Sequence, residues 1–198
     1  DSDEKPFSLA GGLSPTRARA QNLRQSAVIA GAFVEAIERR EGTFQAPKWT
    51  LFWQQWSSSE TKVPIVLFHG SGEHSGRHAG TAARLVAEGF SVHTFDWPGH
   101  GRSPGIRGHI DDFREFVDVA EAFVQRVRTQ TGQVPILLGH SLGGLAATLY
   151  GIEHGDRVRC LILSSPLWGL ALRVPAWKRV IAYSLVGVWP SLTLRRPA

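Results

Sequence analysis

The stretch ILLGHSLGGLAATLY, residues 136–150, decides the fold of this chain. A short apolar run typical of a buried strand ends at Gly139, and an apolar run with helical spacing starts directly after Ser141. Between them lies the pattern G-x-S-x-G, in which glycines on both sides of the serine let strand and helix backbones approach more closely than a Cβ atom would allow. The pattern therefore predicts a tight, strained strand–turn–helix that lifts the Ser141 hydroxyl above a sheet as a nucleophile. A serine that only caps a helix leaves the paired glycines unexplained.

Strand and helix patterns alternate around this stretch. Four apolar strand patterns, PIVLFHG, FSVHTF, VPILLGHS and RVRCLILSSP, alternate with helix patterns in HAGTAARLVAEGF, in residues 111–128 and in LGGLAATLYGIEH. Upstream, TFQAP and TLFWQQW are rich in aromatic residues and predict a hairpin. The alternation predicts an α/β protein, with a mostly parallel sheet and helices on both faces. The loops after the strands then meet at one edge of the sheet, where open α/β sheets bind their ligands.

The loop HGSGEHSG after the first of these strands offers a partner for the nucleophile. Acyl transfer needs two backbone N–H groups aimed at the developing oxyanion. Leu142, directly after the nucleophile, can supply one of them, and Ser71 in this loop can supply the other. We take His69, His140 and Trp168 as candidate substrate-binding residues at the same edge, and for His69 packing under the loop is the simpler alternative.

Bulk composition limits the remaining functional classes. The chain has 198 residues, enough for one domain with a sizeable core, and its single cysteine excludes an internal disulfide framework. A net charge of +5 is spread along the chain, so we expect a solvated basic surface and no nucleic-acid partner. His69, His74 and His78 lack the H-E-x-x-H spacing of a metal site, and no phosphate-cradling or dinucleotide motif occurs. We therefore expect neither a metal nor a cofactor.

Three stretches together resemble a known family. HGSGEHSGRH, DWPGHGRSPG and LLGHSLGG, in this order and spacing, resemble the α/β-hydrolase superfamily, and more narrowly its monoacylglycerol lipase and lysophospholipase branch with a serine aminopeptidase S33-like domain. The resemblance covers residues 42 to about 170. It implies a serine hydrolase that cleaves carboxylic esters of single-chain lipids, with Ser141 as nucleophile and the amides of Ser71 and Leu142 as oxyanion hole.

The sequence after Ser141 offers no suitable acid and histidine to complete a catalytic triad. In this fold they follow the serine, and after Ser141 the chain offers only Glu153, His154 and Asp156. His154 lies at the far end of the expected helix, on the order of 20 Å along its axis, beyond the reach of a general base. Both residues come after the cap in the resembled family. We therefore expect this chain to be the N-terminal part of a hydrolase and to be inactive alone.

The two ends of the chain are expected to form segments separate from the hydrolase core. We expect a tail and an amphipathic helix beginning at Ser14-Pro15 in residues 1–40, the hydrolase core in residues 41–166, and the start of a cap in residues 167–198. Glu35 and Glu38 interrupt the apolar run, which argues against a secretion signal. The cap is rich in tryptophan and aliphatic residues, so it is expected either to contact an acyl chain and a membrane surface or to be core. Because no secretion signal is indicated, we expect a cytoplasmic or peripheral membrane location.

Two alternatives remain open from the sequence. A peptidase or amidase of the same fold would use the same nucleophile and oxyanion hole. An α/β-hydrolase-fold protein without the triad would serve for binding alone.

Overall fold

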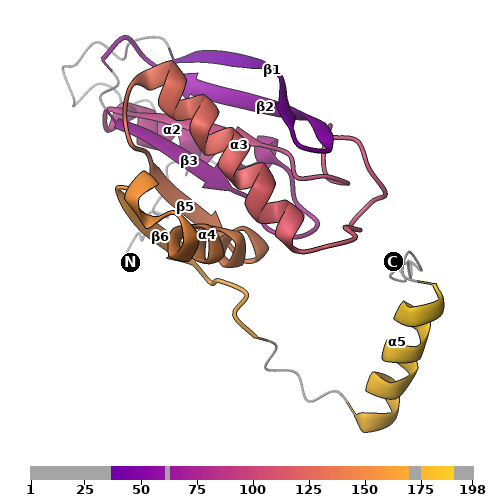
Figure 1. The fold of residues 1–198 in the computed structure, drawn as a ribbon. Coiled ribbons are helices and arrows are strands. Elements are labelled where there is room, and N and C mark those ends of the chain that lie inside the picture. Colours follow the sequence, from indigo (N-terminus) through magenta and orange to yellow (C-terminus); the bar gives the residue numbers. More distant parts are fainter. Residues whose placement is uncertain (1–36, 61–62, 170–174, 190–198) are drawn as a thin grey trace, which may run out of the picture. The chain divides into compact units, whose positions relative to one another are not determined.

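The structure, a computed structural model, describes residues 37–60, 63–169 and 175–189. The expected helix from Ser14 and the cap residues Leu170, Leu172 and Val174 lie outside the described residues. Figure 1 shows the strands and helices of the described part, with bounds as follows: β1 (Glu38–Ala46), β2 (Trp49–Ser57), β3 (Val63–Phe68), η1 (Ser75–His78), α2 (Ala79–Ala87), β4 (Phe90–Phe95), α3 (Arg114–Thr131), β5 (Ile136–His140), α4 (Leu142–Glu153), η2 (Gly155–Arg157), β6 (Cys160–Ser164) and α5 (Ala176–Val188).

The six strands form one sheet in the order β1-β2-β4-β3-β5-β6. The hairpin β1–β2 is antiparallel and joins β4 in antiparallel pairing, whereas β4, β3, β5 and β6 are mutually parallel. The chain therefore crosses over between each pair of parallel strands, and helices α2, α3 and α4 lie in those connections. The predicted α/β architecture with a mostly parallel sheet is confirmed.

The two faces of the sheet are covered by different helices. On β3, Val66 and Phe68 pack into a cluster with side chains of α3 and α4, whereas Leu67 packs with Ala82 and Val86 of α2 on the opposite face. Strand side chains alternate between faces, and both faces are apolar here, so the strand reads as a continuous apolar run. Aromatic rings fill the α3 side, where Phe95 lies 4.7 Å from Phe123 between ring centroids.

The first strand begins earlier than the sequence pattern indicates. Ile37 and Glu38 continue the expected helical pattern, but β1 already starts at Glu38 and pairs with β2 over its whole length. The run Glu38-Arg39-Arg40-Glu41 carries no apolar side chain because β1 is an edge strand. Its charges pair locally, as between Arg40 and Glu38 at 2.8 Å, which suits an edge that must not recruit another strand. The prediction of helix at these two residues is wrong.

The turn between β5 and α4 has an unusual backbone. Ser141 occupies it with φ 51° and ψ −115°, a left-handed conformation that costs a non-glycine residue about 1–3 kcal/mol. Neighbouring segments hold it there: the Ser141 N–H donates to the Ser164 carbonyl at 3.0 Å, and the Ser141 carbonyl accepts the N–H groups of Gly144 and Leu167, each at 3.0 Å. The turn is therefore strained and fixed from two sides.

Glycine is required beside this turn because three backbones meet there. A Cβ atom on Gly143 would overlap the carbonyl oxygen of Phe68 at the end of β3. A Cβ atom on Gly139 would lie 2.7 Å from the Cα of Gly144 in α4. The predicted role of the paired glycines is thus confirmed, and the close contact also joins the end of β3 to the start of α4.

No helix among the described residues is long and apolar enough to cross a membrane.

The strain at Ser141 predicts that a glycine variant is more stable than an alanine variant at this position, the reverse of the order within a helix. Glycine adopts positive φ freely but loses about 0.4–1 kcal/mol through the entropy of the unfolded chain, so Ser141→Gly should be about 1 kcal/mol more stable than Ser141→Ala. Urea unfolding of the two variants measures the difference. Thr129, exposed within α3, is the control, and there the glycine variant should be about 1 kcal/mol less stable than the alanine variant. The same order at both positions would show that the turn stores no strain.

Buried His93 predicts loss of stability in mild acid. Burial, aided by the nearby Arg126 guanidinium, lowers the pKa of His93 from 6.5 to about 4. Below about pH 6.5 His93 binds a proton in the unfolded chain but stays neutral in the folded chain. The free energy of unfolding should therefore fall as the pH decreases toward 4. His93→Gln keeps a hydrogen-bond partner for Ser91, which lies 3.1 Å from the His93 ring, and removes the titration. Urea unfolding at pH 7.5 and 4.5 should show a smaller loss for this variant, and an equal loss would refute the assignment.

Candidate active site

The loop after β3 lies directly against Ser141. A Cβ atom on Gly70 would lie 3.2 Å from the Cβ of Ser141 and 3.3 Å from the His140 ring. The pairing of β3 with β5 explains this proximity, because adjacent parallel strands bring their following loops to the same edge. Gly70 thus leaves room for a small group beside the Ser141 side chain, as an acyl-transfer site requires.

The first amide groups of α4 differ in whether they have an acceptor. The first N–H groups of any helix have no acceptor one turn earlier. At α4 the amides of Gly144 and Leu145 donate to the Ser141 carbonyl at 3.0 and 3.1 Å. The Leu142 amide, one residue after Ser141, has no such acceptor within the helix. It is therefore suitably placed to donate to an anion formed at Ser141.

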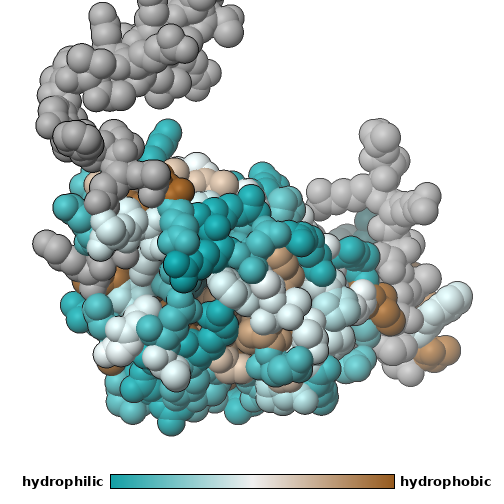
Figure 2. Space-filling model, turned by 90° about the horizontal axis from the view of Figure 1, so that it is seen from above, coloured by the Kyte–Doolittle hydropathy of each residue, from teal (hydrophilic) through white to brown (hydrophobic). Residues whose placement is uncertain are grey.

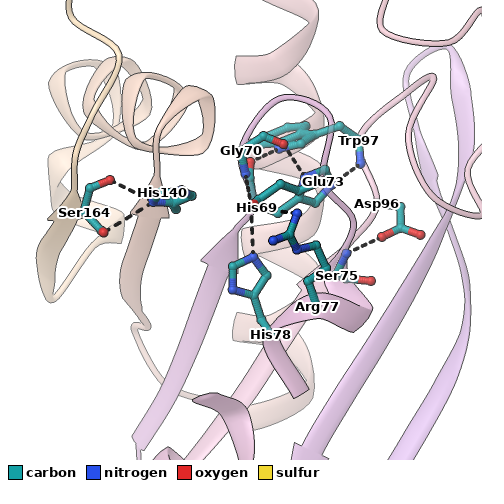
Figure 3. Close-up of polar contacts among 10 residues, drawn as sticks. All are labelled: His69, Gly70, Glu73, Ser75, Arg77, His78, Asp96, Trp97, His140 and Ser164. Carbon is teal, nitrogen blue, oxygen red and sulfur yellow. Dashed lines mark hydrogen bonds and ion pairs between the residues drawn. The ribbon is translucent and has the colours of Figure 1, made fainter. Parts of the chain in front are cut away.

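His69 is fully buried beneath the loop, and both of its ring nitrogens are engaged. Nδ1 lies 2.8 Å from the Gly70 carbonyl oxygen, and Nε2 accepts the Trp97 backbone N–H at 3.1 Å (Figure 3). Burial lowers the pKa of His69 from 6.5 to about 4, so the ring is neutral at pH 7. A ring with no exposed surface and no free nitrogen does not fit the expected substrate contact, and packing under the loop describes it instead.

Glu73 is the acidic residue nearest to this loop's start, and the sequence reading assigned it no role. Its Oε2 accepts the Gly70 N–H at 3.1 Å, and the same oxygen lies 3.4 Å from His78 Nε2 (Figure 3). Burial acts to raise the pKa of Glu73, but the Gly70 N–H together with His78, His140 and Arg77 outweighs it, so the net shift is downward. Glu73 is therefore an ionised anchor for the loop at neutral pH.

Asp96 is a second anchor that the sequence reading missed. It is 1% exposed at the end of β4, and its two carboxylate oxygens accept the N–H groups of Ser75 and Arg102, each at 2.7 Å. Gly101 leaves space for this carboxylate, since a Cβ atom there would overlap it. Asp96 thus ties the loop after β3 to the loop after β4. An aspartate directly after a buried strand pattern was the available signal.

His140 and Trp168 are both accessible at this edge. The Nδ1 atom of His140 lies 3.2 Å from the Ser164 carbonyl oxygen and 3.3 Å from its hydroxyl, at the end of β6 (Figure 3). The Trp168 side chain is 65% exposed, and its indole N–H donates to Thr148 of α4 at 3.1 Å. Both residues flank the turn at Ser141, so their expected role in substrate binding is compatible with their positions and stays a prediction.

None of the histidines reaches the Ser141 hydroxyl within the described residues, which include all eight of them. His154, directly after α4, contacts Tyr150 with the two rings tilted and their centroids 4.9 Å apart, as its distance along the helix predicts. Six further rings contact atoms elsewhere, namely Gly70 and Trp97 for His69, Glu73 for His78, Ser91 for His93, Pro98 for His100, Asp111 for His109 and Ser164 for His140.

A metal centre is also not formed by this part of the chain. Among the residues that the structure describes, no group of three or more His, Cys, Asp or Glu side chains could hold an ion.

Comparisons with known proteins match this geometry. The family model described as serine aminopeptidase, S33, matches residues 59–198. The chain is 34% identical over 139 residues to phospholipase YtpA of Bacillus subtilis, covering 69% of this chain and 53% of that protein. It is 36% identical over 149 residues to monoglyceride lipase of Mus musculus, covering 74% of this chain and 49% of that protein. The chain thus spans about half the length of these relatives.

Solved structures give the same relationship. A monoacylglycerol lipase of Paleococcus ferrophilus superposes with a TM-score of 0.59 at 33% identity, over 80% of this chain and 54% of that one. A soluble variant of monoglyceride lipase from Saccharomyces cerevisiae, in complex with a substrate analog, superposes with a TM-score of 0.67 at 21% identity, over 85% of this chain and 58% of that one, which supports the fold alone. The chain therefore belongs to the serine aminopeptidase S33 family of α/β-hydrolase-fold proteins, in the branch of the monoacylglycerol lipases and lysophospholipases.

Proposed function

We propose that Ser141 is the nucleophile of a carboxylic-ester hydrolase that acts on single-chain lipids of the monoacylglycerol or lysophospholipid type. The observation that carries the proposal is the strained turn that presents Ser141 directly against the Gly70 loop. Strained backbone of this kind is concentrated at active sites, and a left-handed serine between a strand and a helix is the geometry of a nucleophile in this fold. The proposal assigns the amides of Leu142 and Ser71 to bind the ester carbonyl oxygen.

The chemistry assigned to these groups is a two-step acyl transfer. The Ser141 hydroxyl oxygen attacks the ester carbonyl carbon while its proton passes to a base, and the carbonyl oxygen takes the negative charge. The Leu142 and Ser71 N–H groups donate to that oxygen. The alcohol then departs with the proton as the C–O bond breaks, which leaves an acyl group on Ser141. The same base then removes a proton from water, and the resulting hydroxide attacks the acyl carbon. The bond to Ser141 breaks, the fatty acid is released, and the base returns the proton to the Ser141 oxygen.

The base and the acid that orients it are assigned to residues outside these 198. All eight histidines lie in the described part of the chain, and none of them is hydrogen-bonded to the Ser141 hydroxyl there. A general base must come within about 3 Å of the proton that it removes. The relatives phospholipase YtpA and monoglyceride lipase are about twice as long as the matched region, which leaves room for both residues.

The substrate class rests on the relatives' names and on where apolar side chains are exposed. Figure 2 shows a mostly hydrophilic face on which hydrophobic residues are scattered. Eight of the large exposed hydrophobic side chains lie instead within residues 168–189, at Trp168, Trp177, Val180, Ile181, Tyr183, Leu185, Val188 and Trp189. Such a segment suits an acyl chain or the surface of a lipid assembly, with Lys178 and Arg179 near anionic headgroups.

The proposal predicts Ser141-dependent ester hydrolysis that needs more than this chain. The 198-residue chain alone should hydrolyse a short-chain nitrophenyl ester little or not at all, because no base reaches the serine. A longer protein that contains it should hydrolyse the ester and lose at least about a thousandfold in kcat on Ser141→Ala. Parallel assays with monoacylglycerol, lysophospholipid and aminoacyl nitroanilide separate esterase from peptidase. Undiminished turnover by Ser141→Ala would refute the role of Ser141.

The exposed apolar segment predicts binding to lipid vesicles. The chain should co-sediment with vesicles of phosphatidylglycerol and phosphatidylcholine, and Trp177→Ala should weaken that binding by roughly tenfold through lost apolar area. Ile106→Ala is the matched control, since Ile106 is 57% exposed and Trp177 is 61% exposed. Equal binding by both variants and the parent would show that the segment does not contact lipid.

A further inference from the structure

The peptide between Gly70 and Ser71 is the part of the loop on which the proposed oxyanion hole depends. In a trans peptide the C=O and the N–H point in opposite directions across the same rigid plane. Whatever holds the Gly70 carbonyl therefore also decides where the Ser71 N–H points. The Gly70 carbonyl oxygen is held by the buried ring of His69, at 2.8 Å from Nδ1.

The partners of His69 determine which nitrogen carries its proton. A carbonyl oxygen can only accept, so Nδ1 must donate to Gly70. The Trp97 backbone N–H can only donate, so Nε2 must be the bare nitrogen that accepts it at 3.1 Å. Both contacts agree on the neutral tautomer with hydrogen on Nδ1. A second proton, on Nε2, would place two donors against each other inside the protein.

The rest of the surroundings hold the ring and the loop in place. The Trp97 indole N–H donates to the His69 carbonyl at 3.0 Å, so the histidine is bonded to Trp97 through both its ring and its main chain. On the other side of Gly70, the N–H of that residue donates to Glu73 at 3.1 Å. The peptide groups on both sides of Gly70 are thus fixed by side chains, those of His69 and Glu73.

We propose that His69 is a positioning residue for ester hydrolysis: its Nδ1–H holds the Gly70 carbonyl so that the N–H of Ser71 in the same peptide is directed away from the buried ring, toward the edge where Ser141 stands. The oxyanion hole is then preformed and costs no reorganisation when charge develops. This inference rests on the proposed function of Ser141.

The role requires the neutral ring. Burial lowers the pKa of His69 to about 4. The nearby His100 and His78 lower this pKa slightly further, whereas the Gly70 carbonyl and Asp96 raise it, by less than burial lowers it. His100 lies with its ring centroid 5.4 Å from that of His69. The hydrogen bond to Gly70 should therefore persist from neutral pH down to about 4.5.

The tautomer can be measured on the chain as it is. Long-range ¹H–¹⁵N NMR should show His69 with a protonated Nδ1 and a bare Nε2, unchanged between pH 8 and about 5. The opposite tautomer, or a ring that titrates near pH 6.5, would overturn the proposal, because Nδ1 would then not be the donor or the ring would not be neutral in this range.

Two variants separate positioning from packing in a form of the protein that hydrolyses a nitrophenyl ester. The amide nitrogen of His69→Asn can occupy the place of Nδ1, whereas the amide oxygen of His69→Gln can occupy the place of Nε2. His69→Gln should lower kcat on the order of 10- to 100-fold with KM nearly unchanged, less than the loss of an oxyanion donor outright, and His69→Asn should restore kcat to within about fivefold. Thermal unfolding of both variants records the loss of packing.

The outcomes distinguish this inference from the function on which it rests. If Ser141→Ala abolishes hydrolysis but His69→Gln retains the parent's kcat, the positioning role is wrong and the nucleophile stands. Equal loss of kcat in both His69 variants, in proportion to their loss of thermal stability, would also overturn it. If Ser141→Ala retains activity, the proposed function itself fails. Variants that do not fold leave the decision to the NMR measurement.

Discussion

The close approach of three backbones at one edge of the sheet is the constraint on which the rest of this structure depends. The end of β3, the end of β5 and the start of α4 meet where Gly139 and Gly143 carry no side chain. Any Cβ atom at Gly143 would overlap the carbonyl of Phe68, so the helix could not start where it does. The Ser141 backbone lies in a left-handed conformation at this meeting point, and hydrogen bonds to neighbouring segments offset the strain.

Polar side chains extend this constraint to the neighbouring loops. His69, Glu73 and Asp96 lie on or beside the loops after β3 and β4, and each forms hydrogen bonds to backbone groups of these loops. A buried polar group without a partner is costly, so each such bond selects one loop conformation out of many. Loops built from glycine and serine would otherwise be free to sample several arrangements. The result is a rigid frame around Ser141, of the kind that electrostatic stabilisation of a transition state needs.

Much of the fold could be predicted from the sequence because the sheet is apolar on both faces. Continuous runs such as Ile65 to Phe68 indicate buried parallel strands, and the regular spacing from Phe116 to Val127 indicates a helix that packs along one side. The prediction of helix was wrong at Glu38, where a strand is charged along its exposed edge and does not alternate between apolar and polar side chains. Glu38 at the start of β1 belongs to a charged edge strand, which has no apolar period to recognise.

The sequence by itself determined where the turn at Ser141 lies, since the glycines around it and the strand and helix patterns beside it are local features that can be recognised without knowledge of the distant residues that hold the turn in place. Only the tertiary structure decided the roles of His69, Glu73 and Asp96. Histidine and carboxylate side chains can serve as substrate contacts, bases or structural anchors, and the choice depends on which backbone groups lie within hydrogen-bond distance. Those groups come from separate strands and loops, such as Trp97 for His69 and Arg102 for Asp96, and only the register of the sheet brings them together.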